Sequence, residues 1–274
     1  MKLSKFLSVF FPVAFTVIVA AGPPVADDLN PYHEYEFAFK YFEQGDYSAS
    51  MKIVNRLLKK DLDPLWKASY LVLQGNLLGK QRGQNEAAIA SLEEARTLYQ
   101  DQNNEAGLDV VALILAKHYQ DANRLSEAEI LLDKLDQPEA QNKGYLHFLY
   151  ARLALQRQQY DSAMASANKA VAAYLAEDDK VGAAQTQSII GLIYLLSGDG
   201  EKGFQATLDC QEAIVHSGDV DQYFYTLVNT ILYQRCYRGQ DDPATVRIVE
   251  ARLDREYDSD LERLLELCRE QGCP

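Results

Sequence analysis

Residue types that catalyse reactions are present in this sequence, but their spacing does not match known catalytic motifs. His33-Glu34 begins like a His-Glu-x-x-His zinc helix, yet the second histidine is absent. There is no Gly-x-Ser-x-Gly turn for a serine nucleophile and no Gly-x-x-x-x-Gly-Lys-Ser/Thr phosphate loop, and the glycines lie in turns and helix contacts. His118 and His147 lie in segments with helical periodicity, where we expect core or surface roles rather than metal ligation. We therefore expect a chain that is not an enzyme, with no cofactor and no metal.

Cysteines are the other reactive group, and all four lie in the last third of the chain: Cys210, Cys236, Cys268 and Cys273. An even number of cysteines favours disulfides if the chain is exported, as the amino terminus described below predicts, and four cysteines allow three complete pairings. Buried thiols and a zinc site are the alternatives. The zinc site is disfavoured because no Cys-x-x-Cys pair exists and the histidines are mostly distant in sequence.

Charge restricts the classes of partner. The 274 residues carry a formal net charge of -13, with 47% hydrophobic and 24% charged residues, a composition typical of a folded globular protein. Negative charge repels phosphate backbones, and no cluster of lysine and arginine opposes it, so nucleic acid is not an expected partner. The other interpretation of the acidic excess is a solvated surface that maintains solubility.

The amino terminus has the pattern of an export signal. Lys2 and Lys5 precede an apolar run over residues 6–21, which ends in small residues before Gly22. We expect cleavage after Ala21 and a periplasmic or secreted protein. The alternative is an uncleaved inner-membrane anchor facing the periplasm, although the run is shorter than the roughly 20 residues of a spanning helix. A membrane is an expected partner only if this segment stays uncleaved.

A repeat with a period of roughly 35 to 40 residues organises most of the chain. Five segments, each typical of a tight turn that opens a helix, recur at residues 45–50, 84–88, 123–128, 159–163 and 198–203. Upstream of three of these turns lies the same pattern of a large residue, a small residue and a tyrosine. These are Phe37-Ala38 with Tyr41, Leu115-Ala116 with Tyr119, and Ile190-Gly191 with Tyr194. The small residue allows two antiparallel helices to approach closely, and the aromatic residue fills the space beside it.

These residues resemble the tetratricopeptide repeat family over residues 31–216. The resemblance is strong in the first, third and fifth units. It is weaker in the second, where residues 80–83 lengthen the turn, and in the fourth, where Ala154 replaces the aromatic residue. It implies an all-α fold, a right-handed α-solenoid of antiparallel helix pairs. Because only Pro64 and Pro138 lie near the family's closing proline, we expect several longer loops between repeats.

The repeats occupy one part of a larger organisation. The predicted signal segment, residues 1–21, is followed by a short linker over 22–30 and five repeats over 31–216. Residues 217–274 are predicted to form a divergent sixth helix pair and a capping helix, with helices over 220–237, 243–257 and 258–269. A bridge from Cys236 to Cys268 or Cys273 is the preferred pairing, because the last helix of a solenoid packs on those just before it.

The family binds partners in a concave groove lined by the first helix of each pair. The matching positions are Tyr32, Tyr35, Phe39, Phe42, Val110, Leu113, Lys117, Tyr145, Phe148, Arg152, Leu192 and Leu195. The aromatic stripe on the first helix is either a pocket for an apolar or aromatic peptide side chain or packing beneath residues 28–31. Lys117 and Arg152 either hold a carboxylate, such as a peptide carboxy terminus, or are solvated or paired with acidic neighbours.

The resemblance and the export signal together predict a non-catalytic scaffold or adaptor of the bacterial cell envelope, whose partner is a protein or peptide. The alternative is a small-ligand-binding component that serves an envelope transporter or sensor, which would have a closed aromatic pocket near Tyr35 and Phe39.

Export is directly testable. We expect the chain recovered from the periplasmic fraction of expressing bacteria to begin at Gly22, as measured by intact mass. Replacing Lys2 and Lys5 with glutamate should leave the precursor uncleaved, because the signal needs a positive start. A chain that keeps Met1 and stays in the membrane fraction would instead establish the anchor.

Overall fold

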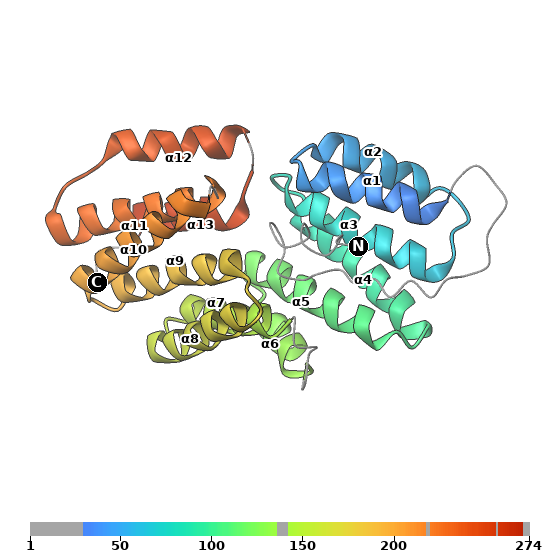
Figure 1. Cartoon of the computed structure of the whole chain (residues 1–274), viewed down its shortest axis with the longest axis horizontal. Coiled ribbons are helices and arrows are strands. Elements are labelled where there is room, and N and C mark those ends of the chain that lie inside the picture. The colour runs from blue at the N-terminus through green and yellow to red at the C-terminus, as the bar shows by residue number, and fades with distance from the viewer. Residues whose placement is uncertain (1–29, 136–141, 218–219, 256, 271–274) are drawn as a thin grey trace. The chain divides into compact units, whose positions relative to one another are not determined.

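The computed structural model describes residues 30–135, 142–217, 220–255 and 257–270, except for the side chains of residues 213–222, 259–260 and 267–270. Within these ranges the chain forms thirteen α-helices and no strand (Figure 1). It divides into two compact units between Gln137 and Pro138. None of the described helices is both long and apolar enough to span a bilayer.

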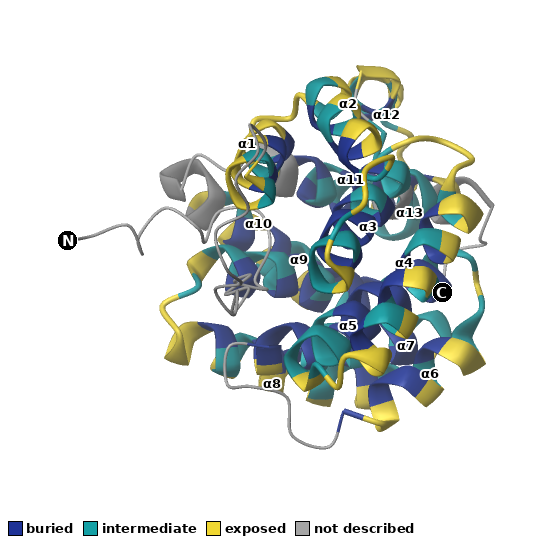
Figure 2. Cartoon of the chain, turned by 90° about the vertical axis from the view of Figure 1, so that its right-hand side faces the viewer, coloured by how far each residue is buried: buried dark blue, intermediate teal, exposed yellow. Residues whose placement is uncertain are grey.

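The first unit contains three helix pairs. Its helices are α1 (Pro31–Glu43), α2 (Tyr47–Leu57), α3 (Pro64–Gly79), α4 (Asn85–Asp101), α5 (Glu105–Asp121) and α6 (Leu125–Asp133). Each helix packs on the next, and α3 also contacts α1 and α5, so the first helices of the pairs lie together. In Figure 2, α3 and α5 carry many buried residues while exposed residues gather at turns.

The second unit continues the same arrangement. Its helices are α7 (Lys143–Gln156), α8 (Tyr160–Ala176), α9 (Lys180–Leu196), α10 (Gly200–Ser217), α11 (Val220–Arg238), α12 (Pro243–Arg255) and α13 (Ser259–Glu270). Here α9 contacts α7 and α11, again the first helices of successive pairs. The all-α architecture of stacked helix pairs that the repeat predicts is confirmed.

Residues with a left-handed backbone conformation allow the chain to reverse direction within a few residues. Six of them end helices at positive φ and lie directly before the next helix's cap: Gly45, Asn103, Asn123, Gln158, Asp178 and Gly198. After each one, the next backbone N–H reaches back to a carbonyl in the finished helix, as from Asp46 to Tyr41 at 2.9 Å. The same Asp46 then caps the following helix by accepting from the Ala49 N–H at 2.9 Å. One residue thus closes the first helix and opens the second.

The expectation of longer loops between repeats is wrong at two places. Gln102–Asn104 joins α4 to α5, and Glu177–Asp179 joins α8 to α9, three residues in each case. The reason is that Asn103 and Asp178 adopt φ of 51° and 57° without being glycine. Polar residues with short side chains tolerate this region, so these helices end without a proline. The predicted lengthening of the turn in the second repeat is confirmed, because five residues separate α3 from α4.

Small residues set the distance between helices, as the repeat predicts. Ala38 and Ala116 are fully buried, and the hydroxyl of buried Ser50 on α2 donates to the Ala38 carbonyl at 2.7 Å. Gly191 is buried as well, and a Cβ atom there would lie 2.9 Å from Thr207 Oγ1 of the paired helix. At these points the backbones approach too closely for a larger side chain.

Tyrosines at helix ends join one pair to the next. Tyr174 at the end of α8 is fully buried, and its ring lies against both Gly144 and Gly182. A Cβ atom at Gly182 would come within 2.6 Å of the ring. Tyr99 at the end of α4 lies against Gly107 in the same way. The tyrosine of one pair therefore fills the space that a glycine leaves at the start of the next pair.

The carboxy-terminal helices agree with the three predicted helices. Their starts at Val220, Pro243 and Ser259 fall within one residue of the predictions, and α11 packs on α9, α10, α12 and α13. Leu261 and Leu265 of α13 join the core there. Cys236 is disulfide-bonded, and Cys210 is a buried thiol. The predicted pairing with Cys268 or Cys273 lies outside the described side chains and stays a prediction.

The left-handed turns give a prediction about stability. Gln158 has a φ of 60°, a conformation that costs roughly 1–2 kcal/mol in a residue with a Cβ atom. Glycine removes that cost but adds about 0.5–1 kcal/mol of chain entropy to the unfolded state. We expect Gln158→Gly to raise the free energy of unfolding by about 0.5–1 kcal/mol in urea titrations.

The matched control is the same replacement at Gln44, which also ends a helix but has a φ of -80°. Gln44→Gly should lower the free energy of unfolding, because no strain is relieved there and the entropic penalty remains. Equal effects at the two positions would contradict the assignment of strain to Gln158.

Candidate partner-binding surface

The first unit carries a cluster of aromatic side chains on α1 and α3. Three of them, Tyr32, Phe39 and Trp66, are exposed or partly exposed, and we call these three the aromatic surface. Tyr32 meets Trp66 edge to face with 6.1 Å between ring centroids. Phe39 stacks on Tyr35 at 6.3 Å, and Tyr35 in turn contacts Trp66 at 6.2 Å. The three rings therefore belong to one connected set.

Buried aromatic residues form the base beneath this surface. Tyr35, Phe42 and Tyr70 are 7%, 5% and 0% exposed. The Tyr70 hydroxyl donates to the Pro31 carbonyl at 2.8 Å, which fixes the start of α1 to α3. Burial raises the pKa of both Tyr35 and Tyr70 well above the ordinary value, so both phenols are neutral at physiological pH. These residues hold the exposed rings in place.

The predicted aromatic stripe thus divides into two parts. Tyr35 and Phe42 pack in the core, while Tyr32 and Phe39 reach the surface. Packing is therefore observed for Tyr35 and Phe42, whereas a binding role for Tyr32 and Phe39 stays a prediction.

The opposite face of α1 differs from the expectation. Phe37 and Tyr41 were predicted to lie on a packed face, but they are 58% and 39% exposed. The matching residues Leu115 and Ile190 are 0% and 7% exposed. The difference arises because α5 and α9 pack on the second helix of the preceding pair, α4 and α8, whereas α1 packs on α2 and α3.

The other predicted groove residues are distributed between the units. Leu113, Tyr145, Arg152, Leu192 and Leu195 are buried, while Val110, Lys117 and Phe148 are partly buried. The rings of Tyr145 and Phe148 stack at 5.9 Å.

The two predicted carboxylate ligands have different surroundings. Lys117 Nζ pairs with Asp121 Oδ2 at 2.6 Å, as the alternative interpretation proposed. Arg152 is 7% exposed. Lys117 belongs to the first unit and Arg152 to the second, so the two form no site within either unit.

Sequence reasoning missed Trp66 and Tyr70. No groove residue was expected on α3, because the second repeat matches the family poorly. A signal was present: Asp63-Pro64 marks a helix start, and Trp66 and Tyr70 follow four residues apart, on one face. Trp66 is also the single tryptophan of the chain.

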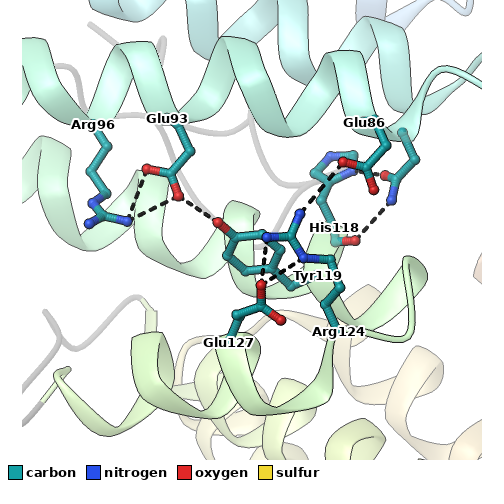
Figure 3. A network of polar contacts seen from close by, with 8 residues as sticks. Glu86, Glu93, Arg96, His118, Tyr119, Arg124 and Glu127 are labelled. Atoms are coloured by element: carbon teal, nitrogen blue, oxygen red, sulfur yellow. Dashed lines mark hydrogen bonds and ion pairs between the residues drawn. The ribbon is translucent and has the colours of Figure 1, made fainter.

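A polar network lies where the second and third pairs meet (Figure 3). The Tyr119 hydroxyl on α5 donates to Glu93 Oε1 on α4 at 2.5 Å, and Arg96 pairs with the same carboxylate at 3.1 Å. Burial and Glu93 raise the pKa of Tyr119 to about 12. The Arg124 guanidinium lies 4.4 Å from the centre of the Tyr119 ring and pairs with Glu127 at 2.6 Å.

This network holds helices together and is not a candidate binding site. Its charges are paired within the network. Beside it, His118 is 3% exposed, and its Nδ1 lies 2.6 Å from Asn85 Oδ1. Asn85 also donates to the His118 carbonyl at 3.0 Å. Of the two roles expected for His118, core or surface, the structure shows the core role.

Comparisons with known proteins identify no family. No protein-family model matches the sequence, and no curated protein matches it. Among solved structures, the chain is similar to one described as Naa15/Naa10 bound to HypK-THB, at 15% sequence identity and a TM-score of 0.35. The match covers 88% of this chain and 39% of that one, so the chain spans less than half the length of that protein.

Because the aromatic stripe on α1 is partly core and partly surface, removing a ring from each part should lower the free energy of unfolding by different amounts. Tyr35→Ala should lower the free energy of unfolding by about 3–5 kcal/mol, because it empties a buried ring site. Phe39→Ala should cost less than about 2 kcal/mol, because that ring is partly exposed. Trp66 fluorescence during urea unfolding reports on this unit alone. Equal losses would show that Phe39 serves packing as much as Tyr35 does.

Proposed function

We propose that the chain is a non-catalytic scaffold that binds a protein or peptide through the aromatic surface of its first unit. The observation that supports this proposal is the arrangement of Tyr32, Phe39 and Trp66, three rings at the surface that are fixed from below by buried rings. Aromatic residues dominate the binding energy of protein interfaces.

Preorganisation strengthens this argument. Binding loses affinity when flexible side chains must be ordered, and a ring with two rotatable bonds has little freedom to lose. Trp66 is in contact with both Tyr32 and Tyr35, and Phe39 is stacked between Tyr35 and Phe42. A partner that covers these rings gains apolar burial with a small entropic cost.

Charge beside the rings indicates the kind of partner. Tyr32, Phe39 and Glu43 follow one another at steps of seven and four residues, so they share one face of α1. Glu43 is partly buried, and this burial raises the pKa of its carboxyl group. A segment that combines an apolar side chain with a basic neighbour would contact both the rings and the Glu43 carboxylate.

The place of action belongs to the same proposal. We place the mature protein in the bacterial cell envelope, on the periplasmic side, because its amino-terminal sequence has the features of an export signal.

Crosslinking in cells followed by mass spectrometry tests the proposal. We expect Phe39→Ala and Trp66→Ala to reduce the recovered partner at least tenfold relative to the native chain. The control is Ile130→Ala on α6, which removes an apolar side chain that is 55% exposed elsewhere in the same unit. Recovery should be unchanged for this control.

One result of the crosslinking experiment would contradict the proposal. If every protein recovered with the native chain is recovered equally with Phe39→Ala and Trp66→Ala, the aromatic surface is not the binding site. Because the chain has a single tryptophan, a purified candidate partner should also change Trp66 emission on binding. A bound partner that leaves this emission unchanged would count against the proposal.

A further inference from the structure

The outward face of α1 is an apolar helix face that the other described residues leave exposed. It consists of Phe37 and Tyr41, flanked by Glu34, Glu36 and Lys40, and we call it the end face. Phe37 is 58% exposed and Tyr41 is 39% exposed. Phe37 and Phe39 differ by about 200° around the helix, so the end face and the aromatic surface are separate.

The repeat shows what normally covers this face. At the matching position of α5, Leu115 is fully buried, and the adjacent Tyr119 hydroxyl donates to Glu93 on α4. At the matching position of α9, Ile190 is 7% exposed. In each case α5 or α9 packs on the second helix of the preceding pair. The end face therefore has the residue pattern of a surface that packs on another helix through apolar contact, to which α5 adds the hydrogen bond from Tyr119 to Glu93.

We propose that a second copy of this chain covers the end face, with α1 antiparallel to α1 of the other copy about a two-fold axis at Phe37. A two-fold interface requires a surface that complements itself. In this arrangement the two Phe37 rings meet at the axis. A residue that follows Phe37 in one copy lies beside residues that precede it in the other.

The charges on α1 complement themselves in this arrangement. Lys40 follows Phe37 and Glu36 precedes it, on the same flank of the end face, so Lys40 of each copy lies within reach of Glu36 of the other. Tyr41 and Glu34 lie on the opposite flank and are related in the same way. Tyr41 of one copy then donates to Glu34 of the other, as Tyr119 donates to Glu93 inside the chain. Glu34 is held in position by Arg56 of α2 at 2.5 Å.

The size of the end face sets the expected strength. One helix face from each copy buries less surface than a standard stable interface, so the association is weak and reversible, with a dissociation constant on the order of 10 µM. It adds to the proposed function without depending on it. A dimer would present two aromatic surfaces, which raises the avidity for a partner with repeated segments.

Sedimentation velocity of the purified full chain tests the proposal over a concentration series from about 1 to 200 µM. We expect the native chain to shift from monomer to dimer across this series. Phe37→Ala should raise the dissociation constant at least tenfold, because it removes the central apolar contact. The matched control, Ile130→Ala, truncates a side chain of nearly the same exposure on α6 and should leave the constant unchanged.

Charge reversal distinguishes this arrangement from other dimers. Lys40→Glu and Glu36→Lys should each raise the dissociation constant, because each places like charges opposite one another. The double variant should restore it to within about threefold of the native value, because the pairs are re-formed with opposite sign. Circular dichroism of each variant excludes unfolding as the cause.

Three outcomes would overturn the proposal. The first is a native chain that stays monomeric over the whole series, which would assign the end face to the segment before α1 or to a different protein. The second is a dimer that Phe37→Ala does not weaken. The third is a double variant that does not recover association. Phe39→Ala should leave dimerisation unchanged, so a failure of the proposed function and a failure of this inference give different results.

Discussion

Reversal of the chain within three residues is the constraint on which both units depend. Where Gly45 or Gly198 enters the left-handed region, the finished helix satisfies its last carbonyls, and the next residue, Asp46 or Asp199, caps a new helix. The two helices are then forced side by side, and a small residue such as Ala38 or Gly191 must lie where they meet. Pairing, spacing and direction all follow from this turn.

A helix pair made in this way cannot bury all its apolar surface alone. Successive pairs therefore pack against each other, and the buried Tyr174 between Gly144 and Gly182 shows how closely they fit. Stability comes from these nearest-neighbour contacts. Because α1 has no preceding pair among the described helices, a residue in its contacting position, such as Phe37, is exposed.

The sequence predicted what depends on periodicity and turn chemistry. The helix pairs, the turns and the starts of α11, α12 and α13 agree with the structure because local patterns determine them. The short connections at Asn103 and Asp178 were missed because a left-handed residue other than glycine has no reliable sequence signal. Periodicity also shows that a face is apolar without showing which neighbour covers it. This is why Phe37 was predicted to be packed and Trp66 was missed.

The two ends of the described chain differ in chemistry, and this difference supports an interacting role for α1. Terminal units of helical repeats need a polar outer face to remain soluble. At the carboxy-terminal end, α13 directs Leu261 and Leu265 inward, while Glu266 is exposed. At the other end, α1 exposes Phe37 on one side and has the aromatic surface on another. A helix that is apolar on two separate faces lowers solubility unless those faces are covered by partners. A helix face that only contacts water would carry charged residues in place of these rings, as the exposed face of α13 does.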